Sequence, residues 1–330
     1  MVEQVRYGLV GTGMMGVEHL NNLAITPGAV VTAIADPVAT SLGWARAALG
    51  DRAQAVEAFD SAAALAASGR CDAVIVATPN HTHRDTLVPL FDAGLHILCE
   101  KPLATTIDDA RWVVARAEET PGIFWTAMEY RYMPPAAAFI ADVHGGAIGT
   151  LRMLSIREHR FPFLVKVGDW NRFAANTGGT MVEKCCHFFD LMRLITGSEP
   201  VRVYCSGAMD VNHLDEDYGG RRPDIIDNSF TTVDFANGVR AMLDLSMFAD
   251  GAGNQEEITA VGDKARLDVF IPEGAIVRSP RVGFGNPKRP ERRVIETDAA
   301  ALAAGSHHGS TFYEHQRFNA AVRGQGPVEV

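Results

Sequence analysis

The stretch GLVGTGMMGVEHL, residues 8–20, contains three glycines in the spacing G-x-G-x-x-G, at Gly11, Gly13 and Gly16. It follows an apolar run typical of a buried strand and opens a segment with helical periodicity. The first glycine permits a tight turn, the second allows close approach of a pyrophosphate, and the third lets the helix pack on the strand. Asp36 ends the next predicted strand about 20 residues later, where it would bind a ribose 2′-hydroxyl and repel a 2′-phosphate. The pattern predicts dinucleotide binding, with NAD preferred over NADP.

The segments that follow this turn alternate between apolar strands and helical patterns. The predicted strands after the first are AVVTAIAD, CDAVIVATP, LHILCEKP and GIFWTAMEY, and helical segments separate them. Such alternation with short links is typical of a parallel sheet covered by helices on both faces. We therefore expect an α/β fold, with a Rossmann-type doubly wound domain over residues 1–126.

The pattern changes after about residue 130. LRMLSIREHRF alternates as a strand, and FTTVDFANGVRAMLDLSMF is typical of two strands joined by an Asn-Gly turn. EITAVGDKARLDVF predicts a second hairpin. Residues 127–330 are therefore predicted to form an α+β domain with a large, mostly antiparallel sheet, which would bind substrate and mediate oligomerisation.

Composition excludes several classes of function. The chain has 330 residues, of which 47% are hydrophobic, and a net charge of −10 without any run of Lys and Arg. Nucleic acid and anionic membranes are therefore poor partners. No apolar run has the roughly 18–20 residues needed to span a bilayer, and no signal peptide is recognisable. The five cysteines follow no CxxC spacing, which favours a reducing cytoplasm.

Residues 99–102 read Cys99-Glu100-Lys101-Pro102 at the carboxyl end of a predicted parallel strand. Ligands of open α/β sheets bind beyond these strand ends. A lysine there can hold an alkoxide or carbonyl oxygen by its charge, and it can exchange a proton when partly desolvated. For an isolated Lys-Pro pair, a surface lysine before a turn would be the better interpretation.

With these motifs together, the chain resembles the Gfo/Idh/MocA family of nicotinamide-dependent oxidoreductases, which includes inositol and sugar dehydrogenases. The matching pieces are GLVGTGMMG, ATPNHTH, AGLHILCEKPLA and GGTMVEKCCHFFDL, in the family's order. The resemblance implies that Lys101 lies near the nicotinamide and the reacting hydroxyl. It also implies a homodimer or homotetramer formed through the outer face of the antiparallel sheet. The cofactor-binding residues expected from the motifs and the resemblance are Gly11, Thr12, Gly13, Met14, Met15, Gly16, Asp36, Thr78, Pro79, Asn80, His83, Glu100 and Lys101.

The stretch TGGTMVEKCCHFFDLM, residues 177–192, gathers polar residues among apolar neighbours. A helix from about Met181 to Ile195 would place Glu183, His187 and Asp190 on one face. Adjacent cysteines at 185 and 186 fit neither a zinc site nor a redox pair, so we expect no metal.

His187 has two interpretations. An isolated histidine is usually a satisfied core residue, but a carboxylate on each side suits a general base. In the family this helix faces the nicotinamide, and its usual pattern is D-x-x-x-H-x-x-D. Here Glu183 replaces the first aspartate and is one methylene longer, so it either reaches the substrate, orients His187 or pairs with Lys101. The expected catalytic residues are Lys101, His187 and Glu183, whereas Asp190 is expected to position the histidine or a neighbouring loop.

Two further segments are expected near the substrate. EYRYMPP supplies Tyr130 and Arg131, and Arg131 could equally form an interdomain ion pair. KVGDWNRF is predicted to be a loop whose tryptophan is suited to packing on a sugar face. The expected substrate-binding residues are Tyr130, Arg131, Lys166, Trp170, Asn171, Arg172 and His187. Surface or structural roles are expected for His213, His307 and His308.

These observations lead to one principal hypothesis and two alternatives. The principal one is an NAD-dependent dehydrogenase that oxidises a secondary alcohol of a sugar, polyol or cyclitol, with Lys101 and His187 handling the hydroxyl proton. The alternatives are a redox-neutral NAD-dependent glycosidase and a non-catalytic NAD/sugar sensor. Relatives usually continue beyond GPVEV, where this sequence stops, so we expect the natural C-terminus to lie further on.

Overall fold

The computed structural model describes residues 4–330 and contains two compact units. The first unit comprises residues up to Glu129 together with Ala175–Gly178 and Asp298–Val330, and the second comprises Tyr130–Ala174 and Gly179–Thr297. The final segment was expected in the second domain, but its helices pack against helix α1 of the first unit. Within residues 4–330, no helix combines the length and the apolar character needed to cross a membrane.

The first unit is built on a six-stranded parallel sheet in the order β3-β2-β1-β4-β5-β6. This order reverses direction between β1 and β4, as in a doubly wound Rossmann-type sheet, and confirms the predicted fold. Only β3 was not predicted; it has three residues, Glu57–Phe59, and none of them is fully buried. The strands are β1 (Val5–Val10), β2 (Ala29–Ala35), β3 (Glu57–Phe59), β4 (Ala73–Val76), β5 (His96–Cys99) and β6 (Phe124–Thr126).

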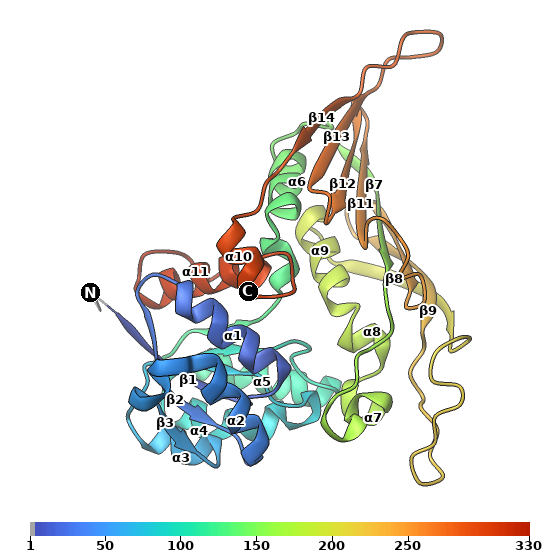
Figure 1. Cartoon of the computed structure of the whole chain (residues 1–330). Coiled ribbons are helices and arrows are strands. Elements are labelled where there is room, and N and C mark those ends of the chain that lie inside the picture. The colour runs from blue at the N-terminus through green and yellow to red at the C-terminus, as the bar shows by residue number, and fades with distance from the viewer. Residues whose placement is uncertain (1–3) are drawn as a thin grey trace. The chain divides into compact units, whose positions relative to one another are not determined.

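Helices cover both faces of this sheet (Figure 1). Helices α1 and α2 contact one another, and α4 contacts both α3 and α5, as right-handed crossovers on the two sides of β1 require. Side-chain caps begin two of them, since Ser61 accepts from Ala64 N–H and Thr106 accepts from Asp109 N–H. The helices are α1 (Met14–Ile25), α2 (Ala39–Leu49), η1 (Gly50–Ala55), α3 (Ala62–Ala67), η2 (Asn80–Thr82), α4 (His83–Asp92), α5 (Ile107–Glu119), α10 (Ala299–Ala304) and α11 (Ser310–Val322). Two short helices lie at the unit boundaries, η3 (Glu129–Tyr132) and α7 (Ala174–Thr177).

The second unit is built on an eight-stranded sheet in the order β14-β13-β12-β11-β7-β10-β9-β8. All the strand pairs recorded in it are antiparallel except β7 with β10, which confirms a mostly antiparallel sheet. Both predicted hairpins are present, β9–β10 and β11–β12, and Gly238 in the first turn has φ +85°. The strands are β7 (Leu151–His159), β8 (Pro200–Ala208), β9 (Asn228–Phe235), β10 (Arg240–Ser246), β11 (Glu256–Gly262), β12 (Ala265–Ile271), β13 (Ala275–Pro280) and β14 (Glu291–Val294).

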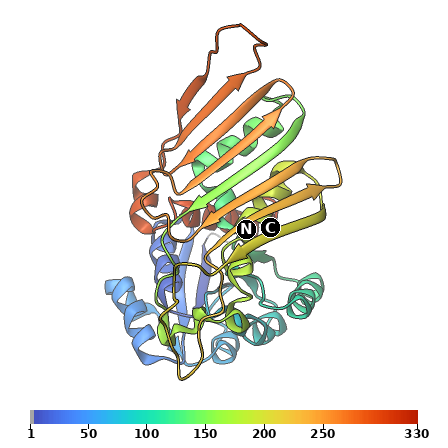
Figure 2. The same cartoon turned by 90° about the vertical axis from the view of Figure 1, so that its right-hand side faces the viewer.

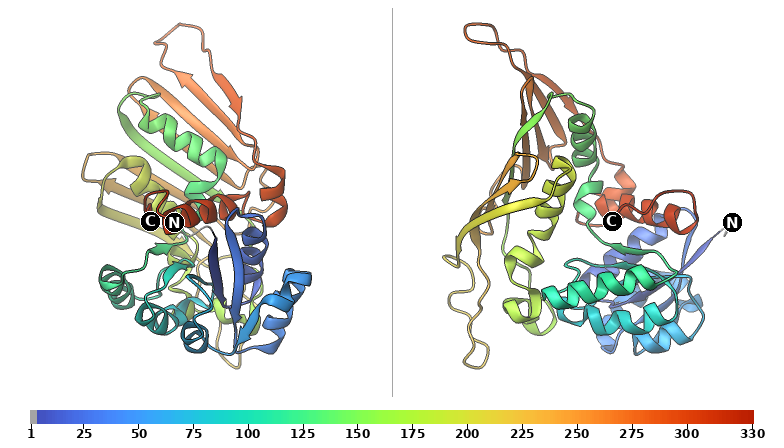
Figure 3. Two further views of the ribbon diagram at one scale, coloured as in Figure 1. Left: turned by 90° about the vertical axis from the view of Figure 1, so that its left-hand side faces the viewer. Right: turned by 180° about the vertical axis from the view of Figure 1, so that it is seen from behind.

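One face of this sheet is covered by α6 (Pro134–His144) and α9 (Cys186–Thr196). Figure 2 shows the strands in front of these helices, and the left view of Figure 3 shows the helices in front of the strands. The covered face forms an apolar core with residues such as Leu154, Leu243 and Phe188. The remaining helices of this unit are η4 (Val167–Arg172) and α8 (Thr180–Glu183).

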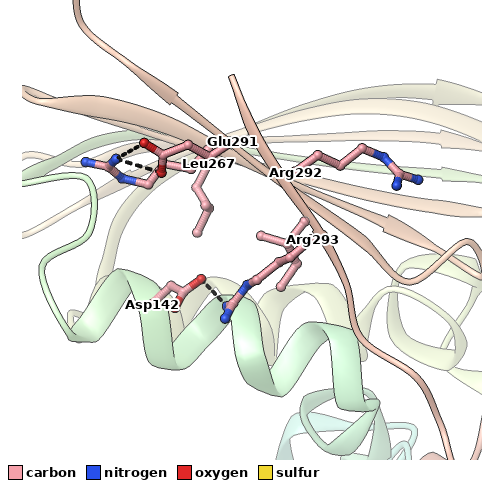
Figure 4. A pocket seen from close by; sticks show the side chains of 7 residues that line it. Asp142, Leu267, Glu291, Arg292 and Arg293 are labelled. Carbon is pink, nitrogen blue, oxygen red and sulfur yellow. Dashed lines mark hydrogen bonds and ion pairs between the residues drawn. The ribbon is translucent and has the colours of Figure 1, made fainter. Parts of the chain in front are cut away.

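A shallow pocket of about 250 Å³ lies where β14 meets β12, β13 and α6 (Figure 4). Arg293 on β14 pairs with Asp142 of α6, and Arg278 on β13 pairs with Glu291 at 3.1 Å. The carboxylates neutralise both guanidinium groups. These ion pairs therefore stabilise the packing of the edge strand β14 on β13 and α6. We interpret the pocket as part of this packing and not as a ligand-binding site.

Candidate functional site

The glycine-rich turn has the geometry that its sequence predicts. Gly11 has φ +89°, and a Cβ added there would lie 2.5 Å from the Ala77 carbonyl oxygen. A Cβ on Gly16 would lie 2.2 Å from the Gly11 oxygen, so the start of α1 packs directly on the turn. A Cβ on Gly13 would meet nothing within 4 Å. The middle glycine therefore borders open space, into which a pyrophosphate fits. Met14 and Met15 form the first turn of α1 next to this space.

Asp36 follows β2 and is held by the same turn. Its Oδ2 accepts hydrogen bonds from the backbone N–H of Thr12 at 2.8 Å and from the Thr12 hydroxyl at 3.1 Å. Its Oδ1 accepts the backbone N–H of Val38 at 2.8 Å. An ionised carboxylate has about four lone-pair sites, so Asp36 retains capacity for a ribose hydroxyl. The carboxylate is thus fixed beside the glycine turn, where the sequence predicted it.

The loop after β4 brings Thr78, Pro79 and Asn80 to the same edge of the sheet. Asn80 is 7% exposed, and its Nδ2 has no hydrogen-bond partner among the residues that the structure describes. A buried amide donor of this kind is costly unless a ligand or water accepts from it. Together with the open space at Gly13, this donor fits a bound dinucleotide.

His83 connects two loops of the site. Its Nδ1 lies 3.0 Å from the Pro102 carbonyl oxygen and its Nε2 lies 3.1 Å from that of Thr78. Burial lowers the pKa of His83, and these carbonyl groups oppose that effect only in part. The ring lies between the Thr78 loop and the turn at Pro102, but a neutral imidazole has one N–H and so donates to only one of the two carbonyls. Its role at the cofactor stays a prediction.

Lys101 follows Glu100 just beyond the carboxyl end of β5. The Glu100 Oε2 accepts the backbone N–H of Lys101 at 3.1 Å, and its Oε1 lies 2.9 Å from His19 Nε2. The other nitrogen of His19 lies 2.9 Å from His315 Nε2 on α11. Burial raises the pKa of Glu100, but the bond and charge of His19 outweigh it and hold the pKa below its usual value. The Glu100 side chain is therefore ionised, and it fixes the backbone of Lys101 through the hydrogen bond from the Lys101 N–H.

A second buried cluster in the first unit joins Glu18, Glu129 and His307. His307 Nδ1 lies 2.7 Å from Glu18 Oε1, and the Thr311 hydroxyl lies within hydrogen-bond distance of both carboxylates, 3.1 Å from Glu18 Oε1 and 2.7 Å from Glu129 Oε2. Burial alone lowers the pKa of His307, but the two carboxylates outweigh it and raise the pKa to about 8. Burial raises the pKa of Glu18, but His307 and Ser306 lower it to about 2.

The same three side chains place ligand atoms within 4.8 Å of one another, close enough to hold a metal ion. A metal would have to displace the proton that the raised pKa keeps on His307, because a ligating histidine must be neutral. We therefore interpret the cluster as an ion pair at the start of α11. Of the surface and structural roles expected for His307, its contact with Glu18 favours the structural one, although the sequence did not indicate the partner.

In the second unit, the predicted helix from Met181 to Ile195 is wrong in one respect. The structure has two helices, α8 and α9, separated by a turn at Lys184 and Cys185. The expected stop is confirmed, since Gly197 is left-handed with φ 58°. Because the turn breaks the 3.6-residue period, the predicted shared face of Glu183 and His187 does not follow from helical spacing. Cys185 lies in the apolar core, as expected for a small buried residue.

His187 and Glu183 are both buried, at 2% and 5% exposure. The His187 imidazole stacks on the Tyr130 ring, with centroids 4.0 Å apart and planes 8° apart. Tyr130 is itself 4% exposed and accepts a hydrogen bond at its hydroxyl from Lys184 Nζ. The structure therefore joins two of the predicted substrate-binding residues, and it adds a lysine that the sequence analysis did not consider.

Arg131 forms an ion pair within the second unit. Its Nε donates to Asp190 Oδ2 at 2.9 Å, and its Nη2 pairs with Asp190 Oδ1. Burial raises the pKa of Asp190, and Arg131 opposes that effect. Of the two roles expected for Asp190, its ion pair favours the positioning of a neighbouring loop, the one that carries Arg131.

The loop predicted from KVGDWNRF is helix η4 with a kink at Gly168 and Asp169. Lys166 Nζ lies 5.2 Å from the Trp170 ring centroid. Asn171 donates to the Leu164 carbonyl at 2.9 Å, and Arg172 Nε donates to Glu216 Oε2 at 2.9 Å. Asn171 and Arg172 are buried and hold the loop together, whereas Lys166 and Trp170 remain partly exposed.

Comparison with known proteins identifies the family. A model described as "Oxidoreductase family, NAD-binding Rossmann fold" matches residues 5–128, and its companion, "Oxidoreductase family, C-terminal alpha/beta domain", matches residues 141–330. The chain belongs to the Gfo/Idh/MocA oxidoreductase family. It is thus an oxidoreductase whose first unit is an NAD-binding Rossmann fold, which agrees with the open space at Gly13.

Individual relatives differ in what their names describe. The rhizopine catabolism protein MocA of Rhizobium meliloti is 32% identical over 201 residues, 59% of this chain and 58% of MocA. The inositol 2-dehydrogenase of Rubrobacter xylanophilus is 30% identical over 296 residues, 88% of this chain and 77% of that enzyme. The solved oxidoreductase domain protein of Kribbella flavida has a TM-score of 0.83 at 20% identity, covering 100% of this chain and 92% of that one. This last likeness concerns the fold alone.

Proposed function

We propose that the protein is an NAD-dependent dehydrogenase that oxidises a secondary alcohol of a sugar, polyol or cyclitol. The observation that carries the proposal is the position of Lys101. It stands beyond the carboxyl end of β5, in the same Rossmann unit as the Gly11 turn and Asn80. The inositol 2-dehydrogenase relative supports the substrate class.

In the proposed reaction, the residues of this chain handle the hydroxyl proton. His187 takes the proton while the Lys101 ammonium group stabilises the alkoxide by charge, or the two exchange these roles. When bound, NAD accepts the hydride from the carbinol carbon. Glu100 fixes the backbone of Lys101 through the bond to its N–H. Glu183 orients His187 or contacts the substrate directly.

The proposed substrate side chains divide by exposure. Lys166, directly before η4, and Trp170 within it are partly exposed, and the indole face of Trp170 can pack on a sugar ring. Arg172 is held by Glu216, so its proposed contribution is to shape the loop that carries Trp170. We propose that Tyr130 and Arg131 also lie next to the substrate.

The experiment is a measurement of NADH absorbance with NAD and a panel of inositols, free sugars and glycosides. Lys101→Ala and His187→Ala are compared with the parent and with Lys264→Ala, a control at an exposed turn. We expect NADH to accumulate with one substrate class and the rate to fall by about 10²–10⁴-fold in the first two variants only. Release of an aglycone without NADH would instead indicate a redox-neutral glycosidase, and NAD binding without any turnover would indicate a sensor.

We also propose that the chain assembles as a homodimer or homotetramer through the open face of the eight-stranded sheet, in the cytoplasm. Met153, Phe230 and Met242 project from this face with 55%, 62% and 40% of their surfaces exposed. Clustered apolar side chains on a sheet face mark an interaction surface. In an isologous interface the same face of two copies of the chain is in contact, so we propose a second copy as the partner.

A further inference from the structure

A lysine is buried in the apolar core of the second unit. Lys184 lies in the turn between α8 and α9 and is 3% exposed. Lysine is almost never fully buried unless it is paired, because removing an ammonium group from water is costly. Its partners therefore indicate what the lysine does.

Lys184 connects a carboxylate to a phenol. Its Nζ lies 2.9 Å from Glu158 Oε1 on β7, and it donates a hydrogen bond to the Tyr130 hydroxyl. Glu256 on β11 and Arg160 after β7 are the other charged groups that act on it. The Arg160 Nη1 lies 3.7 Å from Glu158 Oε1. The ammonium group is thus anchored on the sheet and reaches Tyr130 from there.

The cluster contains two basic side chains, Lys184 and Arg160, and two acidic ones, Glu158 and Glu256. Burial and the neighbouring Glu158 raise the pKa of Glu256 to about 8, so Glu256 is largely protonated at pH 7. Burial lowers the pKa of Lys184, and Glu158 opposes that effect. Lys184 and Arg160 therefore both face Glu158, at 2.9 and 3.7 Å, while Glu256 is largely neutral.

Tyr130 is held on several sides. Lys184 binds its hydroxyl, Phe188 meets its ring edge-on at 5.8 Å with planes 73° apart, and His187 stacks on the ring at 4.0 Å. The orientation of the Tyr130 ring therefore sets the plane in which the imidazole of His187 lies. A fixed plane matters for proton transfer, since a general base must meet its proton at hydrogen-bond distance.

We propose that Lys184 is a positioning residue for His187, acting through the Tyr130 hydroxyl while Glu158 anchors its ammonium group. The inference rests on the proposed function, in which His187 handles the hydroxyl proton. A purely structural role explains less, because apolar residues of similar volume often fill a core at least as well as a buried ion pair. What the lysine adds is a directed hydrogen bond to one oxygen.

Three variants separate positioning from packing. Tyr130→Phe removes the hydroxyl and keeps the ring. Lys184→Met alone leaves Glu158 buried without its partner, so the double variant Lys184→Met/Glu158→Gln removes both charges together. Lys264→Met makes the same substitution at an exposed turn and serves as the control. Circular dichroism confirms folding before any other measurement.

The first readout is independent of activity. The ring resonances of His187, assigned with His187→Gln, are followed by NMR from pH 5 to 9. We expect Tyr130→Phe and the double variant to change the chemical shifts of His187 and to move its apparent pKa by about half a unit or more. Lys264→Met should leave both unchanged.

The second readout is the steady-state kinetics with the best substrate from the panel. We expect kcat to fall about tenfold or more in both variants, with KM within about twofold, and the pH profile of kcat to move with the His187 titration. Combining Tyr130→Phe with the double variant should add little further loss, because both remove the same hydrogen bond.

The outcomes separate this inference from the proposed function. His187 resonances and pH profile that match the parent in folded Tyr130→Phe would overturn the positioning role, whether or not the double variant folds. If the resonances move but the parent oxidises no member of the panel, the positioning stands and the dehydrogenase proposal fails. If the parent is active and only KM changes, Lys184 acts on substrate binding and the inference is wrong.

Discussion

His307 Nδ1 lies 2.7 Å from Glu18 Oε1, although the two residues are 289 positions apart in the chain. The raised pKa of His307, about 8, makes this pair a source of pH-dependent stability. The contribution is fully present below the unfolded pKa of about 6.5 and is lost as pH rises through 8. It amounts to at most about 2 kcal/mol, because each pKa unit corresponds to about 1.4 kcal/mol.

We therefore predict that His307→Gln lowers the melting temperature at pH 6 by several degrees and by less at pH 8.5. Glu18 acts at the acidic end: its stabilising effect is present above pH 4.5 and is lost as pH falls towards 2. Thermal melts of the parent, His307→Gln and the exposed control His144→Gln test this. A constant difference between parent and His307→Gln across pH 6–8.5 would contradict the assignment.

The glycine turn gives a prediction with opposite outcomes at neighbouring positions. Gly13→Ala should change the free energy of unfolding by no more than about 1 kcal/mol relative to the parent, because the new Cβ meets nothing within 4 Å. The same methyl should weaken NAD binding about tenfold or more by intruding on the pyrophosphate. Gly16→Ala should instead destabilise the fold, since its Cβ would lie 2.2 Å from the Gly11 oxygen. Melting temperatures and NAD titrations decide both, and unaltered NAD affinity in Gly13→Ala would refute the cofactor placement.

Cofactor preference is predicted to depend on the charge of Asp36. Asp36→Ala should narrow the preference for NAD over NADP, but it also removes the acceptor for Thr12 and Val38 N–H groups. Asp36→Asn keeps an acceptor and removes the charge, so it should narrow the preference with less loss of stability. Dissociation constants of both nucleotides provide the measurement. If the parent bound NAD and NADP with equal affinity, the proposed role of Asp36 in cofactor preference would be wrong.

Glu256 should limit stability at alkaline pH. Its pKa is raised to about 8 by burial and by Glu158. Its contribution is greatest below pH 4.5 and is lost as pH rises through 8. Glu256→Gln removes this loss, so its melting temperature relative to the parent should rise between pH 5 and 8.5. Glu257→Gln, on the neighbouring partly exposed position, is the control. A difference that does not vary with pH would show that Glu256 is ionised throughout.

Assembly is predicted to depend on the open sheet face. Phe230→Lys places a charge among the exposed apolar side chains without entering the core. We expect a shift towards monomer in light scattering after size exclusion, with NAD binding retained. Phe284→Lys, at the exposed β13–β14 loop, is the matched control. A parent that is monomeric at micromolar concentration would refute the proposal.

Several features of the site were predictable because their signals are local. The spacing of Gly11, Gly13 and Gly16 encodes a turn whose steric demands arise within a few residues and one neighbouring strand. The Asn-Gly turn at Gly238 encodes a hairpin in the same way. The helix around His187 was predicted less well: it is interrupted at Lys184, whose side chain pairs with Glu158 on a distant strand, and helical periodicity carries no signal of such a contact.

The sequence by itself determined the Rossmann-type order of the first unit, the mostly antiparallel sheet of the second, and the side chains gathered after β1, β2, β4 and β5. Periodicity and glycine spacing record these features, because backbone geometry acts over a few residues. Only the tertiary structure decided that His307 joins Glu18, that Arg131 binds Asp190, and that Lys184 reaches Tyr130. Such pairs form between segments far apart in the chain, and each buried charge is stable only where the fold supplies its partner.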